Sequence, residues 1–153
     1  MPFGKNSGRP NLLLVLDSNE FIFGLGLFPQ QASQVLLECL IGWVPTHPVR
    51  VPRTIVQEVL RHLTPEASRE FFQIMEALGQ IDEDSVVPFE LGNKYELRGL
   101  KPADAFIAAY AEWIGADALI TENRHFLTRH SDLPFHVMTA HSFLEFCAKH
   151  PRD

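Results

Sequence analysis

The sequence predicts an α/β protein in which a central parallel sheet of about five strands lies between two layers of helices. Three observations favour this fold class: strand-like and helical patterns alternate along the chain, the first strand is apolar without interruption, and one late helix is apolar on nearly every side. Uninterrupted apolar strands are typical of parallel sheets that are covered on both faces. Alternating strands and helices are joined by right-handed crossovers. We therefore expect a three-layer α/β/α sandwich.

The first expected strand is the apolar run 12–16, which ends abruptly at Asp17. The expected helices have apolar residues at helical spacing, and two of them are followed by glycine, which favours a helix end. The segment 91–100 is ambiguous, with a short helix as one interpretation. The expected strands are 12–16, 49–51, 85–89, 118–121 and 135–139, and the expected helices are 32–43, 52–63, 65–78, 102–114 and 141–149.

Length and composition indicate one ordinary globular domain. The chain has 153 residues, of which 46% are hydrophobic and 21% charged, so we expect a single domain over residues 11–150 after a flexible segment at 1–10. No stretch reaches the roughly 18 apolar residues of a membrane helix, and the first ten residues lack the apolar run of a secretion signal. Cys39 and Cys147 are read as reduced thiols. These features predict a cytoplasmic protein without a membrane partner.

Three carboxylates are expected at the edge of the sheet where parallel strands end and ligands commonly bind. Asp17 follows the first strand, Glu58 flanks the apolar stripe of an early helix, and Asp104 lies in the first turn of the apolar helix. Each has an ordinary alternative role. Asp17 can cap a helix with Glu20 completing a capping box, Glu58 can contact His62 on the helix surface, and Asp104 can interact with the helix dipole.

The chemistry of three neighbouring carboxylates points to a divalent metal. Such groups repel one another and raise each other's pKa unless a cation neutralises them. Hard oxygen ligands favour Mg²⁺ or Mn²⁺. The chain carries a net charge of −6, so local basic patches or metal ions are needed if it is to bind nucleic acid. A metal bound there can activate water for phosphodiester hydrolysis. Zinc motifs, a phosphate-binding GxxxxGK[ST] loop and a dinucleotide motif are not found in the sequence.

The strings VLDSNEF, TIVQEVL, KPADAFIAAYA and GADALITENRHF occur in this order over nearly the whole chain. In order and spacing they resemble the PIN-domain family, in particular its VapC-like toxin ribonucleases. The resemblance implies an α/β/α sandwich, cleavage of RNA with Mg²⁺ or Mn²⁺, frequent homodimers, and often an antitoxin partner. It assigns Asp17, Glu58 and Asp104 to the first three acidic metal-site positions and Ser18 to a common small hydroxyl position.

The fourth acidic position departs from the family pattern. Asn123 stands where an Asp is common, and Glu122 precedes it. An amide oxygen is a weaker, uncharged ligand, so one metal is better supported than two. We expect Asn123 to face the site, with Glu122 as the alternative fourth acid. Asp117 precedes its strand, and we expect it to brace a turn at the opposite edge of the sheet.

Basic residues after the fourth expected strand could steer RNA phosphates, although a solvated basic loop is an equally good interpretation. They are Arg124, His125, Arg129 and His130. Trp43 and Trp113 have helical apolar neighbours, which favours core or dimer packing over base stacking. Two other functions remain open: a phosphoacceptor or phosphatase domain, disfavoured because Ser18 and Asn19 stand where a second acid is usual, and a PIN-like module that binds RNA or protein without efficient catalysis, which Asn123 favours.

Overall fold

The structure is a computed structural model that describes residues 11–42, 47–128 and 132–149. A five-stranded sheet in the order β3-β2-β1-β4-β5 lies at its centre, and its four strand pairings are all parallel. The predicted flexible segment 1–10 lies outside the described residues, as do Trp43, Arg129 and His130. The strands are β1 (Leu14–Leu16), β2 (Val49–Pro52), β3 (Gly79–Asp82), β4 (Ala118–Ile120) and β5 (His136–Met138).

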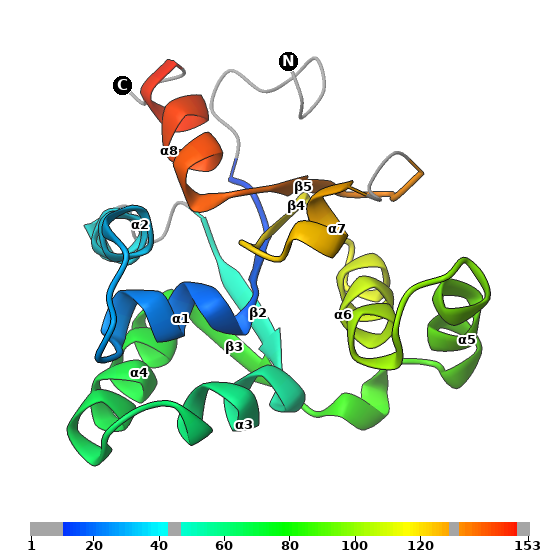
Figure 1. Ribbon diagram of the computed structural model, residues 1–153, viewed down its shortest axis with the longest axis horizontal. Coiled ribbons are helices and arrows are strands. Elements are labelled where there is room, and N and C mark those ends of the chain that lie inside the picture. Colours follow the sequence, from blue (N-terminus) through cyan, green and yellow to red (C-terminus); the bar gives the residue numbers. More distant parts are fainter. Residues whose placement is uncertain (1–10, 43–46, 129–131, 150–153) are drawn as a thin grey trace.

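Helices cover both faces of this sheet, which confirms the predicted three-layer sandwich. Helices α1 to α4 connect β1, β2 and β3 on one side, and α5 to α7 accompany β4 and β5 on the other, while α8 packs against α2 (Figure 1). The helices are α1 (Ser18–Leu25), α2 (Gln31–Gly42), α3 (Arg53–Arg61), α4 (Pro65–Leu78), α5 (Phe89–Leu97), α6 (Pro102–Trp113), α7 (Arg124–Thr128) and α8 (Ala140–Lys149), with a 3₁₀ turn, η1, at Asp84–Val86.

The strands are added to the sheet in one direction from β1 and in the opposite direction from β4, although β1 and β4 run parallel. From β1 the chain moves outward through β2 to β3, and from β4 it moves outward the other way to β5. The two central strands pair in register, with Leu16 opposite Ile120. Ligands of such sheets bind beyond the carboxyl ends of the strands at this point of reversal. Asp17 and Thr121, the residues that follow the two strands, therefore stand at the expected ligand position.

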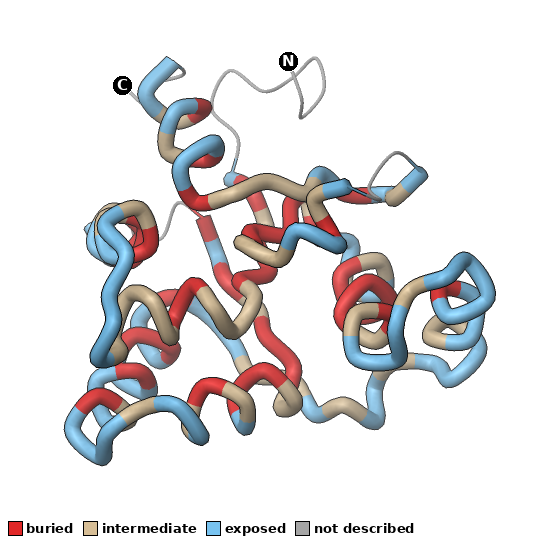
Figure 2. Tube along the Cα trace, in the orientation of Figure 1, coloured by how far each residue is buried: buried red, intermediate tan, exposed pale blue. Residues whose placement is uncertain are grey.

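The core is formed by the central strands and the helix faces that cover them (Figure 2). Strands β1 and β4 are completely buried, as the apolar run in the sequence predicts. Helix α6 begins at Pro102 and is buried over most of its length because its alanines allow close packing. Gly115, with a φ of 70°, follows its end. At the opposite edge of the sheet, Asp117 accepts a hydrogen bond from the Leu13 amide at 2.7 Å, which confirms its predicted bracing role.

The predicted strand at 85–89 is wrong. The third strand is Gly79–Asp82, and residues 84–86 form the 3₁₀ turn instead. β3 is an edge strand whose residues are exposed or only partly buried, so its sequence GQID carries no apolar signal. The apolar run VVPF that suggested a strand is largely at the surface, where Phe89 is 77% exposed.

The structure also settles one segment that the sequence left open and changes the description of two others. Residues Arg124–Thr128 form the short helix α7, not a loop, the ambiguous segment is the helix α5, and the expected helix 32–43 is described as Gln31–Gly42. Trp113 is 44% exposed, so it is not a core residue. Among the described residues, no helix is both long enough and apolar enough to cross a membrane.

Gly79 supplies a test of the β2–β3 pairing. A Cβ atom at this position would lie 1.6 Å from the Val49 backbone oxygen, so Gly79→Ala forces the edge strand away and should lower the free energy of unfolding by about 1–3 kcal/mol. Gly92 in α5 has no atom within 4 Å of the corresponding position, and Gly92→Ala should be neutral or stabilising by up to about 1 kcal/mol. Urea unfolding of both variants measures the difference; equal effects would contradict the close approach.

Candidate active site

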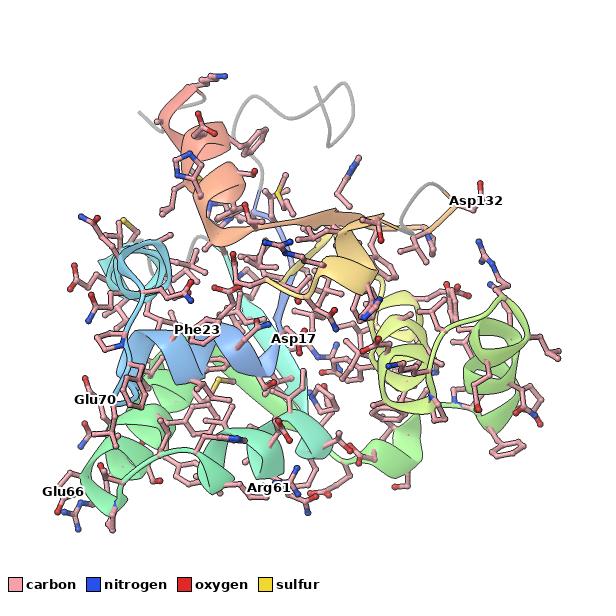
Figure 3. All side chains as sticks on the ribbon, in the orientation of Figure 1. Asp17, Phe23, Arg61, Glu66, Glu70 and Asp132 are labelled. Atoms are coloured by element: carbon pink, nitrogen blue, oxygen red, sulfur yellow. The ribbon has the colours of Figure 1, made fainter. Side chains whose placement is uncertain are left out.

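Asp17 is fixed between the two central strands. Its amide donates to the Ile120 carbonyl at 2.9 Å, and the Thr121 hydroxyl donates to its Oδ2 at 2.6 Å. Its Oδ1 accepts from the Ser18 amide at 2.8 Å, which caps α1. Figure 3 shows Asp17 at the end of β1, inside the fold, whereas Arg61, Glu66 and Glu70 lie on the outer surface. The capping role expected as an alternative is therefore present, but the side chain also has a fixed place at the switch point.

The pKa of the Asp17 carboxyl is raised. Burial is the largest cause; the hydrogen bonds from Thr121 and Ser18 oppose it, and the charges of Asp104 and Glu58 raise it further. These two charges act on Asp17 because they lie near it, although the three residues are far apart in sequence. Asp104 and Glu58 are therefore within electrostatic range of Asp17.

Asp104 and Asn123 face each other across the gap between α6 and the β4–α7 connection. Asn123 Nδ2 donates to Asp104 Oδ1 at 3.3 Å, and Asn123 Oδ1 accepts from the His125 amide at 3.0 Å. The amide of Asn123 donates in turn to the Thr121 hydroxyl at 3.0 Å. The side chain of Asn123 therefore presents a hydrogen-bond donor to Asp104, while its oxygen binds the first turn of α7.

Glu58 lies at the rim of the site. Its side chain is 39% exposed and forms an ion pair with Arg61, one turn later on α3. His62 contacts the backbone oxygen of Glu58 at 3.0 Å and not its carboxylate. The Arg61 guanidinium holds Glu58 toward the surface, so this carboxylate has to turn inward to share a ligand with Asp17.

The donor set fits a hard divalent cation, although the side chains do not already form a cage. Among the described residues, no group of three or more His, Cys, Asp or Glu side chains is arranged closely enough to hold a metal ion. The charges of Asp104 and Glu58 nevertheless act on Asp17 at the switch point, and carboxylate oxygens are the preferred ligands of Mg²⁺ and Mn²⁺. A cation between them would also offset the repulsion that raises the pKa of Asp17.

Two solved structures share this architecture. A chain of the crystal structure of VapBC2 from Rickettsia felis bound to a DNA fragment from their promoter superposes with a TM-score of 0.56 and 18% identity, over 82% of this chain and 97% of that chain. A chain of FitAcB from Neisseria gonorrhoeae gives a TM-score of 0.53 and 16% identity, over 84% and 98%. The chain has their fold. No protein-family model and no curated protein matches it, so the likeness establishes architecture alone.

Glu122 points away from the three carboxylates. Its Oε2 accepts from the Ala140 amide at 2.9 Å, at the first turn of α8, and its backbone amide donates to Asn19 Oδ1 at 3.4 Å. Of the two residues considered for the fourth position, Asn123 is therefore the one that lies beside Asp104. Arg124 is exposed at the start of α7.

Thr121 was missed by the sequence analysis, which treated it only as the end of a strand. It is completely buried and its hydroxyl connects Asp17 with the amide of Asn123. The signal that could have found it is the strand register: if the two apolar runs pair side by side, the polar residue after one lies beside the polar residue after the other.

Glu20 is not part of a capping box, because its side chain is directed into the core. It is completely buried, its Oε1 accepts from the Ser33 hydroxyl at 2.9 Å, and its Oε2 has no hydrogen-bond partner. Burial first, and then the neighbouring Glu122, raise the pKa of Glu20 to about 9. At neutral pH Glu20 is therefore held protonated, which removes the repulsion between two neighbouring carboxylates.

Glu20→Gln should remove a pH dependence of stability. The folded protein holds a proton on Glu20 that the unfolded chain releases above its ordinary pKa of 4.5. This group's contribution to stability is therefore largest below pH 4.5 and declines as the pH rises toward 9, by up to about 1.4 kcal/mol per unit. Glutamine has nearly the same shape and can accept from Ser33 without titrating, so the stability of the variant should increase relative to that of the wild type between pH 5.5 and 8.

Thermal and urea unfolding at several pH values measure this difference. Glu70→Gln, at an exposed position of α4, serves as the matched control and should follow the wild type throughout. Parallel wild-type and Glu20→Gln curves over this range would show that Glu20 is not held protonated in the fold.

Proposed function

We propose that the protein is a metal-dependent endoribonuclease that hydrolyses RNA phosphodiester bonds. The observation that supports the proposal is that the charges of Asp104 and Glu58, on two other elements, raise the pKa of Asp17 at the switch point of a parallel sheet. Carboxylates with that placement and repulsion suit a bound Mg²⁺ or Mn²⁺. RNA as the substrate rests on the resemblance to PIN-domain ribonucleases, and the shared fold supports it.

Each residue of the site has a distinct task in this proposal. Asp17, Glu58 and Asp104 would hold Mg²⁺ or Mn²⁺, which supplies a water of lowered pKa and a positive charge next to the phosphate. Thr121 keeps Asp17 oriented by its hydrogen bond. Asn123 keeps one Asp104 oxygen in position, and Ser18 fixes the other Asp17 oxygen through its backbone amide. To act as a ligand, Glu58 would break its ion pair with Arg61 and turn toward the metal.

A toxin of a toxin–antitoxin pair is the cellular role that we favour for this activity. VapBC2 and FitAcB are among the solved structures that share the fold, and the resemblance of the sequence to VapC-like toxins implies an antitoxin partner. Exposed apolar side chains are available for an antitoxin or for a second copy of the chain: Leu27 and Phe28 follow α1, Phe72 lies on α4, and Trp113 ends α6. Co-expression of the adjacent reading frame and mass measurement of the purified complex test this role.

A catalytically weakened PIN-like module is the second candidate, and two observations favour it. Asn123 turns a donor, not an oxygen, toward Asp104, and Glu58 is paired with Arg61. The two candidates differ in whether a divalent cation is bound and used. Mn²⁺-dependent cleavage of RNA by the wild type and its variants distinguishes them.

Asp17→Asn and Asp104→Asn should each reduce Mn²⁺-dependent cleavage of single-stranded RNA by about 100-fold or more, because each removes a charged ligand. Asp132→Asn, at a side chain that is 81% exposed, is the matched control and should cleave at the wild-type rate. Initial rates on an end-labelled RNA, with and without the metal, measure the effect. Metal-independent cleavage, or no cleavage by the wild type, would favour the binding module.

Asn123→Asp should change the stability in opposite senses with and without metal. Without a divalent cation, the variant loses the hydrogen bond to Asp104 and gains repulsion, so its melting temperature should fall. With Mn²⁺, a fourth charged ligand should tighten binding, and the increase in melting temperature on adding Mn²⁺ should exceed that of the wild type. Asn93→Asp, on the exposed face of α5, is the control. An equal Mn²⁺ response in all three proteins would contradict a metal site at Asn123.

A further inference from the structure

A cavity of about 100 Å³ opens beside Asp104, between the α5–α6 turn and α7. One wall is the turn, where Gly99 adopts a φ of 97°, and the other is the start of α7. The cavity is lined by Gly99, Leu100, Lys101, Asp104, His125 and Phe126. It therefore shares Asp104 with the candidate active site and extends away from Asp17.

The lining of this cavity combines an apolar base with hydrogen-bond donors. Phe126 is buried and Leu100 is partly buried, whereas Lys101 and His125 are exposed. An ammonium group and an imidazole on opposite walls, above apolar carbon, suit an anionic group that has lost part of its water. The volume is sufficient for a tetrahedral anion but is small for a whole nucleotide.

Two cations next to the cavity, like Arg69 on α4 and Lys149 on α8, have no ion-pair partner among the described residues. In the described part of the chain, the side chains of Lys101 and Arg124 form no ion pair, whereas Arg50, Arg53, Arg61, Lys94 and Arg98 are all paired with acidic residues. A chain with a net charge of −6 thus keeps unpaired positive charge beside its acidic site. Such a local patch is what an acidic protein needs in order to bind a polyanion.

We propose that this cavity is the subsite for a backbone phosphate of the RNA that neighbours the scissile one. Lys101 contacts the phosphate as a point charge, and the His125 ring supplies a second contact from the opposite wall. The inference rests on the proposed ribonuclease function, because Asp104 is the wall that joins the two sites. The negative charge of Asp104 opposes an anion in the cavity, so phosphate binding depends on a divalent cation at the carboxylates.

Binding of a non-cleavable RNA tests the subsite separately from catalysis. An oligonucleotide with 2′-O-methyl groups is titrated by fluorescence anisotropy with Mg²⁺ at several salt concentrations. Lys101→Gln should bind roughly fivefold more weakly than the wild type, and the slope of log affinity against log salt should become shallower by about 0.7, the loss of one phosphate contact to a single strand. Lys101→Arg should restore both. His125→Gln should weaken binding in the same direction.

Arg69→Gln, at an exposed position of α4 on the other side of the sheet, is the matched control for a change of net charge. Wild-type binding by Lys101→Gln and His125→Gln, or an equal loss in Arg69→Gln, would overturn the subsite. Inorganic phosphate at millimolar concentration should not displace the RNA, and full displacement would show a site for free phosphate instead.

Cleavage assays on an unmodified RNA keep the two proposals distinguishable. In Lys101→Gln, KM should rise with kcat nearly unchanged, because the contact is made equally in the ground state and the transition state. Wild-type protein that binds the modified RNA with the expected Lys101 dependence but cleaves nothing would refute the ribonuclease and retain the subsite. Wild-type protein that cleaves, with KM unaffected by Lys101→Gln, would refute the subsite alone.

Discussion

The parallel pairing of β1 with β4 is the constraint on which the rest of the molecule depends. The register that sets Leu16 opposite Ile120 also sets Asp17 beside Thr121. The strand order changes direction at this pair of parallel strands, which leaves the space beyond it free of a crossover helix. Helices α3 and α6 carry Glu58 and Asp104, whose charges act on Asp17. The acidic site is thus a product of sheet topology more than of any local motif.

The order of elements was predictable because central parallel strands are apolar throughout, and that signal does not depend on neighbours. The edge strand β3 was not, because GQID is paired along one side only and its residues stay partly in water. For the same reason Val86 and Phe89 misled: apolar residues also lie at the surface. Sequence pattern reports burial, and it identifies a strand only where burial and strand coincide.

The positions of Asp17, at the end of the first strand, and Asp104, in the first turn of α6, could be predicted from the sequence. Their hydrogen bonds could not. Whether Asn123 turns its amide nitrogen or its amide oxygen toward Asp104 depends on the competing backbone amide of His125. Glu20 has the spacing of a capping residue, yet its side chain is buried against Ser33 and Glu122. In both cases the side chain is directed by a residue that is brought near it only by the fold: Asp104 for Asn123 and Ser33 for Glu20.

The bond between Glu122 and the first amide of α8 makes the last helix a part of the loop that carries Asn123. Glu122 and Asn123 are adjacent but bond to different helices. Glu122 accepts from the first amide of α8, and Asn123 donates to Asp104 on α6. A ligand that displaced α8 would therefore act on the position of Asn123 through Glu122, while contacting none of Asp17, Glu58 and Asp104. Helix α8 is therefore connected to the candidate active site by one hydrogen bond and one peptide link.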